Sequence, residues 1–384
     1  MGKVRFGVVG LGFVAEAHAA GLLSSEKAVV EAVCDTHPER LRARAEGWGV
    51  KKRFSSFEAM LKDADITAVD ILTPPFLHAQ MAVKAAEAGK HVLVEKPMCT
   101  TLREADEVID AARRAGVKLM VAESYVFLTA HMEARRLIES GAIGEPVQVR
   151  EVKGTWLPRP LSLRLPPTDI PWRDDPARSG GGPYPWVMDH FPHIFATARY
   201  FMEDRDIEKV YSLTSTRKSR KEATGLLGRD VVVVCWEYVG GGKQGVWARI
   251  DESLDAFDHL GFRTVVNGTQ GSIQVLGEGG GPALSGVKTP PIMVEKPNET
   301  LALRIDEGPD RVWVSEVNYY DRAHRNEIEH FITCVLEDRE PRYTGEDGRK
   351  EIQATLAAIM SAMEDKPIRL ASIPREWSAY SQSH

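Results

Sequence analysis

The sequence feature that most restricts the fold is a glycine turn directly after a short apolar run. Residues 3–9 are mostly apolar, Gly10-Leu11-Gly12-Phe13-Val14-Ala15 follows, and the alanine-rich sequence through Leu23 has helical character. Strand, glycine turn and helix form the setting of a dinucleotide fingerprint, whose glycines make the turn and let the backbone approach a pyrophosphate. The glycines alone could instead mark an ordinary tight turn. In this setting we expect cofactor contacts from Gly10, Gly12, Phe13 and Val14 at the helix N-terminus.

The next apolar run ends at an acidic residue. It spans Ala28 to Cys34 and is followed by Asp35, about where a downstream carboxylate meets the adenosine ribose hydroxyls. Because a carboxylate repels a 2′-phosphate, Asp35 favours NAD over NADP, although Arg40 lies close enough to limit this preference. Asp35 could instead cap a helix that starts at Pro38.

Apolar runs and amphipathic segments continue to alternate through the first third of the chain. This alternation predicts an α/β fold with a doubly wound, parallel Rossmann sheet. We expect helices near 37–47, 76–88 and 101–115, and strands near 68–72, 91–94 and 117–121. Thr73, Pro74 and His78 follow one strand at its carboxyl end, where open α/β sheets collect ligands, so they are cofactor candidates. By residue type, His78 could equally be an ordinary histidine in a helix's first turn.

The composition changes near residue 122, and a different architecture follows. A helix is expected at about 128–140, and short strand-like runs separated by turn residues predict an α+β domain with a large, mostly antiparallel open sheet. These runs lie near 147–154, 207–215, 230–239, 244–251, 261–266 and 271–276, and residues 366–384 look like a short terminal strand or tail. We therefore expect a cofactor domain at 1–122 and a substrate and assembly domain at 123–384.

The tripeptide Glu95-Lys96-Pro97 closes one of the predicted parallel strands. Pro97 biases Lys96 toward an extended backbone, so the ammonium is directed out of the sheet edge. A cation there suits the stabilisation of an alkoxide, although a lysine at a strand end is often only solvated surface. The same tripeptide recurs as Glu295-Lys296-Pro297 in a proline-rich segment that we expect to be a loop, so we treat that copy as coincidence.

Asp189 and His193 lie one helical turn apart, behind a glycine run at 180–182 that we expect to leave room for a substrate. Oxidation of an alcohol needs a base for the hydroxyl proton; His193 suits this role, and Asp189 could orient its ring. Two alternatives remain open. Pro192 fits best in a helix's first turn, which would make Asp189 an N-cap. His190 is a competing base, although adjacent helix positions point apart.

These motifs, in their order and spacing, resemble the Gfo/Idh/MocA family of NAD(P)-dependent sugar and cyclitol oxidoreductases. The matching segments are 10–15, Glu95-Lys96-Pro97, 143–146, Trp172-Arg173, 179–182, Asp189 with His193, 267–271 and 331–341. The resemblance implies catalytic roles for Lys96, Asp189 and His193. It also implies that Trp172 and Arg173 approach the nicotinamide or its phosphates, and that the second sheet packs against another subunit in a homodimer or homotetramer.

The sequence departs from the family pattern around the expected pocket. Where the family commonly has Asn and Arg, this chain has Glu123-Ser124-Tyr125-Val126-Phe127, and Phe191 replaces the usual glycine between Asp189 and His193. These differences leave the identity of the sugar or cyclitol open. The expected substrate contacts are Lys96, Glu123, Tyr125, Arg173, Asp189 and His193, and the expected cofactor contacts further include Thr73, Pro74, His78 and Glu95. A cofactor-binding regulator without turnover, and a reductase of a non-carbohydrate substrate, remain alternatives.

Composition excludes several other classes. Lys and Arg number 49 against 55 Asp and Glu, a net charge of -6 that provides no basic surface for nucleic acid. The four cysteines lie far apart in sequence and form no metal-binding or disulfide spacing. No run is long and apolar enough for a signal peptide or a membrane span, so we expect a cytoplasmic protein. Asp189, His190 and His193 cannot all converge on one ion from a regular helix, so we expect no metal.

Overall fold

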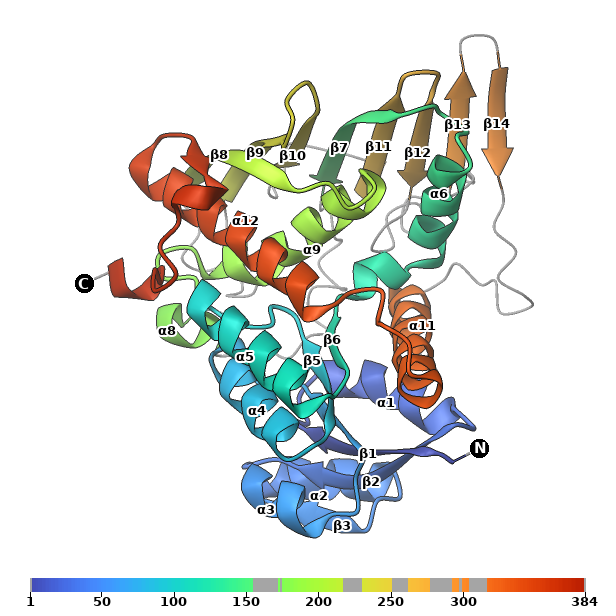
Figure 1. Ribbon diagram of the computed structural model, residues 1–384, viewed down its shortest axis with the longest axis vertical. Coiled ribbons are helices and arrows are strands. Elements are labelled where there is room, and N and C mark those ends of the chain that lie inside the picture. Colours follow the sequence, from blue (N-terminus) through green and yellow to red (C-terminus); the bar gives the residue numbers. More distant parts are fainter. Residues whose placement is uncertain are drawn as a thin grey trace.

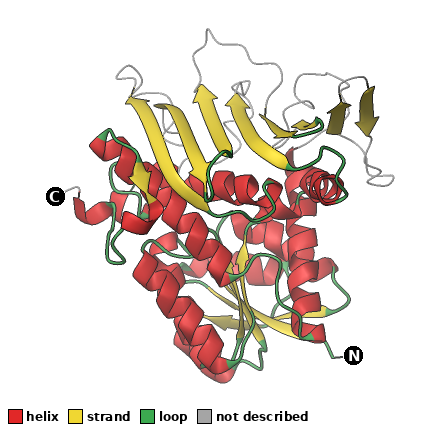
Figure 2. Cartoon of the chain, turned by 45° about the horizontal axis from the view of Figure 1, so that its top comes forward, coloured by secondary structure: helices red, strands yellow, loops and turns green. Residues whose placement is uncertain are grey.

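The chain forms two sheets with helices packed between and beside them (Figures 1 and 2). The computed structural model describes residues 2–154, 172, 175–216, 230–250, 262–276, 292–296, 299–303 and 316–382. Among these residues, no helix combines the length and apolar character needed to cross a membrane.

The first sheet has six parallel strands in the order β3-β2-β1-β4-β5-β6. This is the strand order of a dinucleotide-binding fold, so the predicted doubly wound sheet is confirmed. The chain order reverses between β1 and β4, and ligands bind at that point in such sheets. The strands are β1 (Val4–Val9), β2 (Ala28–Cys34), β3 (Lys52–Phe54), β4 (Ala68–Ile71), β5 (His91–Glu95) and β6 (Leu119–Ala122).

Helices follow the strands at nearly the predicted positions. They are α1 (Val14–Ser24), α2 (Pro38–Gly47), α3 (Phe57–Asp63), α4 (Pro75–Glu87) and α5 (Leu102–Ala115). Strand β3 and helix α3 were not predicted, because both are too short to show a clear period in the sequence.

The second sheet has nine strands in the order β14-β13-β12-β11-β7-β10-β9-β8-β15. Its described pairs are antiparallel except for β7 with β10, so the predicted mostly antiparallel sheet is confirmed. The strands are β7 (Pro146–Gly154), β8 (Ile207–Thr216), β9 (Asp230–Tyr238), β10 (Gln244–Ile250), β11 (Phe262–Gly268), β12 (Ser272–Leu276), β13 (Ile292–Lys296), β14 (Glu299–Leu303) and β15 (Ile368–Arg369).

The structure corrects one strand prediction. Glu295 and Lys296 end β13 rather than lying in a loop. Because β13 pairs antiparallel with β14, Glu295 and Lys296 lie in a hairpin strand and not before a helix, and Pro297 lies outside the described residues.

The last two long helices return to the first sheet. They are α11 (Glu316–Glu337) and α12 (Gly345–Glu364), and Figure 1 shows α11 beside α1. Glycines let these helices pack closely against the cofactor domain. A Cβ on Gly21 of α1 would lie 3.0 Å from Ile328 Cγ1 on α11. A Cβ on Gly348 of α12 would lie 2.7 Å from Val121 Cγ2 on β6. The strands before residue 122 form the first sheet and the later strands form the second. The C-terminal helices nevertheless complete the packing of the cofactor domain.

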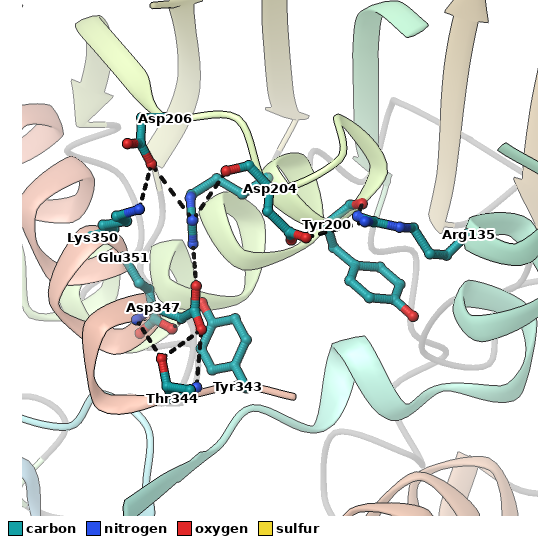
Figure 3. Close-up of polar contacts among 10 residues, drawn as sticks. Arg135, Tyr200, Asp204, Asp206, Tyr343, Thr344, Asp347, Lys350 and Glu351 are labelled. Atoms are coloured by element: carbon teal, nitrogen blue, oxygen red, sulfur yellow. Dashed lines mark hydrogen bonds and ion pairs between the residues drawn. The ribbon is translucent and has the colours of Figure 1, made fainter. Parts of the chain in front are cut away.

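Helix α9 (Pro185–Phe201), which carries Asp189 and His193, is fixed to α12 by a network of ion pairs. The buried Arg199 guanidinium lies 3.1 Å from Asp347 Oδ1, and Asp206 lies 2.8 Å from Lys350 Nζ (Figure 3). Tyr343 donates a hydrogen bond to the buried Glu351 carboxyl at 2.9 Å in the same region. Through Arg199, the C-terminal half of α9 is held against α12, which also touches β6.

Candidate active site

The glycine turn has the geometry that a dinucleotide requires. Gly10 has a φ of +86°, and a Cβ there would lie 2.6 Å from the Leu72 carbonyl carbon, so only glycine fits between the β1 and β4 ends. A Cβ on Gly12 would meet nothing within 4 Å, which leaves open space at the start of α1. Phe13 occupies the N-cap position of α1, and its side chain is exposed. Val14 is the first residue of the helix. The residues present therefore fit a pyrophosphate at this helix end.

Asp35 is more heavily engaged than the sequence suggests. Its carboxylate accepts hydrogen bonds from the backbone amides of Leu11 and His37, at 2.9 and 2.7 Å, and from the Arg40 guanidinium at 2.8 and 3.1 Å. Burial alone would raise the pKa of this carboxyl, but the bonds from Arg40, His37 and Leu11 lower it below its ordinary value. Asp35 thus ties the glycine turn to α2, and Arg40 brings a positive charge to the position expected to meet the ribose.

The loops after β4 and β5 are joined by His78. Its Nδ1 lies 2.7 Å from the Pro97 carbonyl oxygen, and its Nε2 contacts the Thr73 carbonyl oxygen. Burial lowers the pKa of this imidazole. Pro74 caps α4, and Thr73 is half-buried beside it. His78 therefore fixes the spacing of two loops at the carboxyl ends of neighbouring strands, one of which carries Lys96.

Lys96 reaches across to α9. Its ammonium donates a hydrogen bond of 2.8 Å to the Asp189 backbone carbonyl and lies 3.4 Å from Asp189 Oδ1. Pro192 lies inside α9, where it cannot donate to the Met188 carbonyl and its ring disturbs that turn. Helix α9 starts at Pro185 with Tyr184 as its cap, so the alternative that Asp189 is an N-cap is wrong.

His193 is held by residues from the segment after β6. Its Nδ1 lies 2.6 Å from Oε1 of the fully buried Glu123, and its ring stacks on Tyr125 with centroids 4.2 Å apart and planes 21° apart. Glu123 Oε1 also accepts the Tyr125 amide at 3.0 Å, at the start of the 3-10 helix η1 (Ser124–Phe127). The sequence led us to expect Asp189 at this ring nitrogen, whereas the structure places Glu123 there.

Other expected site residues have distinct positions. His190 Nδ1 lies 3.2 Å from Asp189 Oδ2, so the expectation that these neighbours point apart is wrong: an imidazole can turn back and reach the preceding side chain. The first two glycines of the run, Gly180 and Gly181, pack against protein and do not leave room for a substrate. A Cβ on Gly180 would lie 2.4 Å from Thr100 Cγ2, so the run permits close packing against the loop that follows Lys96. Trp172 is half-buried, and Arg173 lies outside the described residues.

Several carboxyl groups are buried behind Lys96 and His193. Burial raises the pKa of Glu95 to about 7, and the Lys96 charge opposes this rise. Burial and the charge of Glu123 raise the pKa of Glu351 well above its ordinary value. The Lys96 charge lowers the pKa of both groups, against the effect of burial.

Comparison with known sequences identifies the family. Residues 4–123 match the oxidoreductase family with an NAD-binding Rossmann fold, and residues 131–274 match the GFO/IDH/MocA C-terminal domain. The chain belongs to the Gfo/Idh/MocA oxidoreductase family. The family assignment confirms the resemblance expected from the glycine turn, the Glu-Lys-Pro tripeptide and the Asp189–His193 spacing.

Individual relatives match over nearly their whole length. The 1,5-anhydro-D-fructose reductase of Ensifer adhaerens is 29% identical over 359 residues, which cover 93% of this chain and 96% of that protein. The myo-inositol 2-dehydrogenase of Thermotoga maritima is 27% identical over 375 residues, covering 96% and 99%. The structure of levoglucosan dehydrogenase with NADH and L-sorbose has a TM-score of 0.77 at 22% identity, covering 97% of this chain and all of that one, and shows a shared fold.

Proposed function

We propose that this protein transfers a hydride between NAD and a secondary hydroxyl or ketone of a sugar, glycoside or cyclitol. The observation that carries the proposal is the hydrogen bond from Lys96 Nζ to the Asp189 carbonyl. It brings the ammonium from the end of β5 to the helical turn that carries His193. The proposal therefore assigns the ammonium and the imidazole to one site at the edge of a dinucleotide-binding sheet, where ligands collect.

In this proposal the chain's own residues move the proton and stabilise the oxygen. The nicotinamide, when bound, accepts or donates the hydride. Because His193 Nδ1 is engaged with Glu123, the Nδ1–H tautomer is favoured and Nε2 is left as the basic nitrogen for the substrate hydroxyl. Lys96 stabilises negative charge as it develops on that oxygen. Asp189 holds the Lys96 ammonium, and Tyr125 limits rotation of the imidazole ring.

The relatives support the proposed substrate class. Their names specify an anhydro-sugar reductase and an inositol dehydrogenase, and both proteins align with almost all of this chain. NAD is the proposed cofactor because Asp35 places a carboxylate after β2, although its pair with Arg40 reduces the expected discrimination against NADP.

The test is a screen of sugars, anhydro-sugars and inositols for NAD reduction by the purified protein. We expect at least one substrate for the parent and strong losses for Lys96→Ala and His193→Ala. Titration with NADH and NADPH, followed by cofactor fluorescence, should show tighter NADH binding. Tight cofactor binding with no turnover on any substrate would favour a regulator over an enzyme, and equal affinities would remove the role given to Asp35.

We also propose that the protein assembles through the open face of its second sheet. Leu213 on β8 and Val233 on β9 are directly opposite each other in the sheet, and 54% and 36% of their surfaces are exposed. In Figure 2 the described helices lie on the other side of this sheet. Light scattering of the parent should give a dimer or tetramer mass, and Leu213→Glu should lower it. A monomeric parent would refute this assembly.

A further inference from the structure

A second cluster of titratable groups lies between α1 and α11, close enough for its charges to act on Glu95, the neighbour of Lys96. His18 comes from α1, whereas His324 and Glu327 lie one turn apart on the same face of α11. All three side chains are buried, and one ligand atom from each lies within 4.8 Å of the others. Nothing in the proposed hydride transfer uses them.

The spacing of these groups matches that of ligands around one ion. His18 Nε2 lies 3.8 Å and His324 Nδ1 lies 3.5 Å from Glu327 Oε1, and the two imidazole centroids are 5.0 Å apart. Two imidazoles on one tetrahedral Zn²⁺, with bonds of about 2.0–2.1 Å, have donor atoms roughly 3.3 Å apart and centroids roughly 5 Å apart. Shifts of about half an ångström would bring the donors onto an ion.

Two atoms in the cluster point to a missing partner. Neither His18 Nε2 nor Glu327 Oε2 has a hydrogen-bond partner among the described residues, and both side chains are fully buried. Buried polar atoms in proteins are almost always satisfied, so such atoms suggest a ligand. The missing bond at His18 Nε2 faces the two α11 side chains.

The other nitrogen of His18 has the partner that a metal-binding histidine usually has. Its Nδ1 lies 3.0 Å from Oδ2 of the buried Asp70 on β4. A carboxylate that accepts the Nδ1 hydrogen fixes the tautomer and leaves Nε2 free to bind a metal. The charges of Asp70 and Glu327 would together balance one divalent cation.

We propose that His18, His324 and Glu327 bind one divalent transition-metal ion, with Zn²⁺ best suited to two imidazoles and a carboxylate. The second oxygen of Glu327 can supply the fourth donor. The ion would join the helix that starts at the glycine turn to a C-terminal helix, and would stabilise the fold rather than take part in hydride transfer.

The test uses Co²⁺ as a spectroscopic substitute for Zn²⁺. Because the cluster is buried, Co²⁺ is supplied in the growth medium so that it is present when the chain folds. We expect one equivalent of Co²⁺ per chain, visible d–d bands of four-coordinate Co²⁺, and paramagnetically shifted imidazole N–H resonances from two histidines. These parent measurements do not depend on any variant.

Glu327→Gln is the matched variant. Glutamine has nearly the size and shape of the Glu327 side chain but lacks the carboxylate that binds such ions, so this variant should preserve the fold. We expect less than a tenth of an equivalent of Co²⁺ in this variant with an unchanged circular dichroism spectrum. His193→Asn should keep the full equivalent, which separates this cluster from the proposed active site. A parent without Co²⁺, Co²⁺ without histidine signals, or equal Co²⁺ in parent and Glu327→Gln would each overturn the proposal.

Discussion

Two imidazole–carboxylate pairs in this protein have similar local contacts but different surroundings. His18 Nδ1 lies 3.0 Å from Asp70 on β4, and His193 Nδ1 lies 2.6 Å from Glu123 just after β6. The side chain of His18 is fully buried, whereas 13% of the His193 side chain is exposed. A carboxylate at Nδ1 therefore does not by itself make a histidine a base. The exposed fraction of the side chain is what differs between the proposed catalyst and the buried pair.

The elements around each pair explain this difference. Helix α11 covers His18 with His324 and Glu327, so its second nitrogen faces protein. Tyr125 covers one face of the His193 ring, and the Lys96 ammonium lies against the same turn of α9. We therefore expect changes at the first pair to lower stability and changes at the second to lower the reaction rate.

The largest effect is expected for His193→Asn. Removal of a general base lowers rates by about 10²–10⁴-fold, so kcat should fall by this factor while the free energy of unfolding stays within about 1 kcal/mol. Steady-state NAD reduction and urea unfolding measure the two quantities. His190→Ala is the matched control from the adjacent position. If His190→Ala loses the activity and His193→Asn keeps it, the base is assigned to the wrong histidine.

The next effect is expected for Asp70→Ala. Removing one partner of a buried charge pair costs about 3–5 kcal/mol, because the remaining charge stays desolvated. Urea unfolding should show this loss, and hydride transfer in the folded fraction should stay within a few-fold of the parent. An unchanged stability would mean that His18 does not depend on Asp70.

The pH dependence of stability offers a third test of the buried pair. Burial lowers the pKa of His18, but Asp70 and Glu327 outweigh this and raise it from 6.5 to about 9. Because the pKa of His18 is higher in the folded state than in the unfolded state, protonated His18 stabilises the folded state. This stabilisation is complete below pH 6.5 and is lost as the pH rises through 9. In protein grown without added transition metals, His18 should lower the free energy of unfolding by about 3 kcal/mol across this window, and Glu95 and Glu327, whose pKa values burial raises, should add to this fall. Asp70→Ala should flatten the curve; equal slopes would contradict the assignment.

The smallest effect is expected for Glu123→Gln. Glutamine can still accept the Nδ1 hydrogen but provides no charge to stabilise an imidazolium, so kcat should fall about 10–50-fold. The acid limb of the pH–rate profile should move to lower pH, a change that a purely structural role would not produce. Glu123→Asp, which keeps the charge, should recover part of the rate. An unchanged profile in both variants would make Glu123 a structural residue only.

The sequence predicted the two sheets and most of their elements because both follow local patterns. The glycine turn, the strand ends and the position of Lys96 depend on residues close together in the chain. The partner of His193 could not be found in this way, because Glu123 lies 70 positions away and meets it only after folding. The alternative start of α9 at Asp189 arose because Pro192 looked like a first-turn proline, whereas Pro185 occupies that place.

The buried cluster was also invisible in the sequence. His18 lies in an alanine-rich helix, and its partners come from β4 and from α11, about 50 and 300 residues away along the chain. The i, i+3 spacing of His324 and Glu327 is the one local signal that could have suggested a shared site.

The most direct test measures hydride transfer and stability on the same preparations of His193→Asn and Asp70→Ala. Single-turnover NAD reduction gives the rate, and urea unfolding gives the free energy. We expect opposite losses: His193→Asn should lose the rate and keep its stability, and Asp70→Ala should lose stability and keep the rate while folded. A folded Asp70→Ala without hydride transfer, together with a His193→Asn that turns over at the parent rate, would contradict the division between the two pairs.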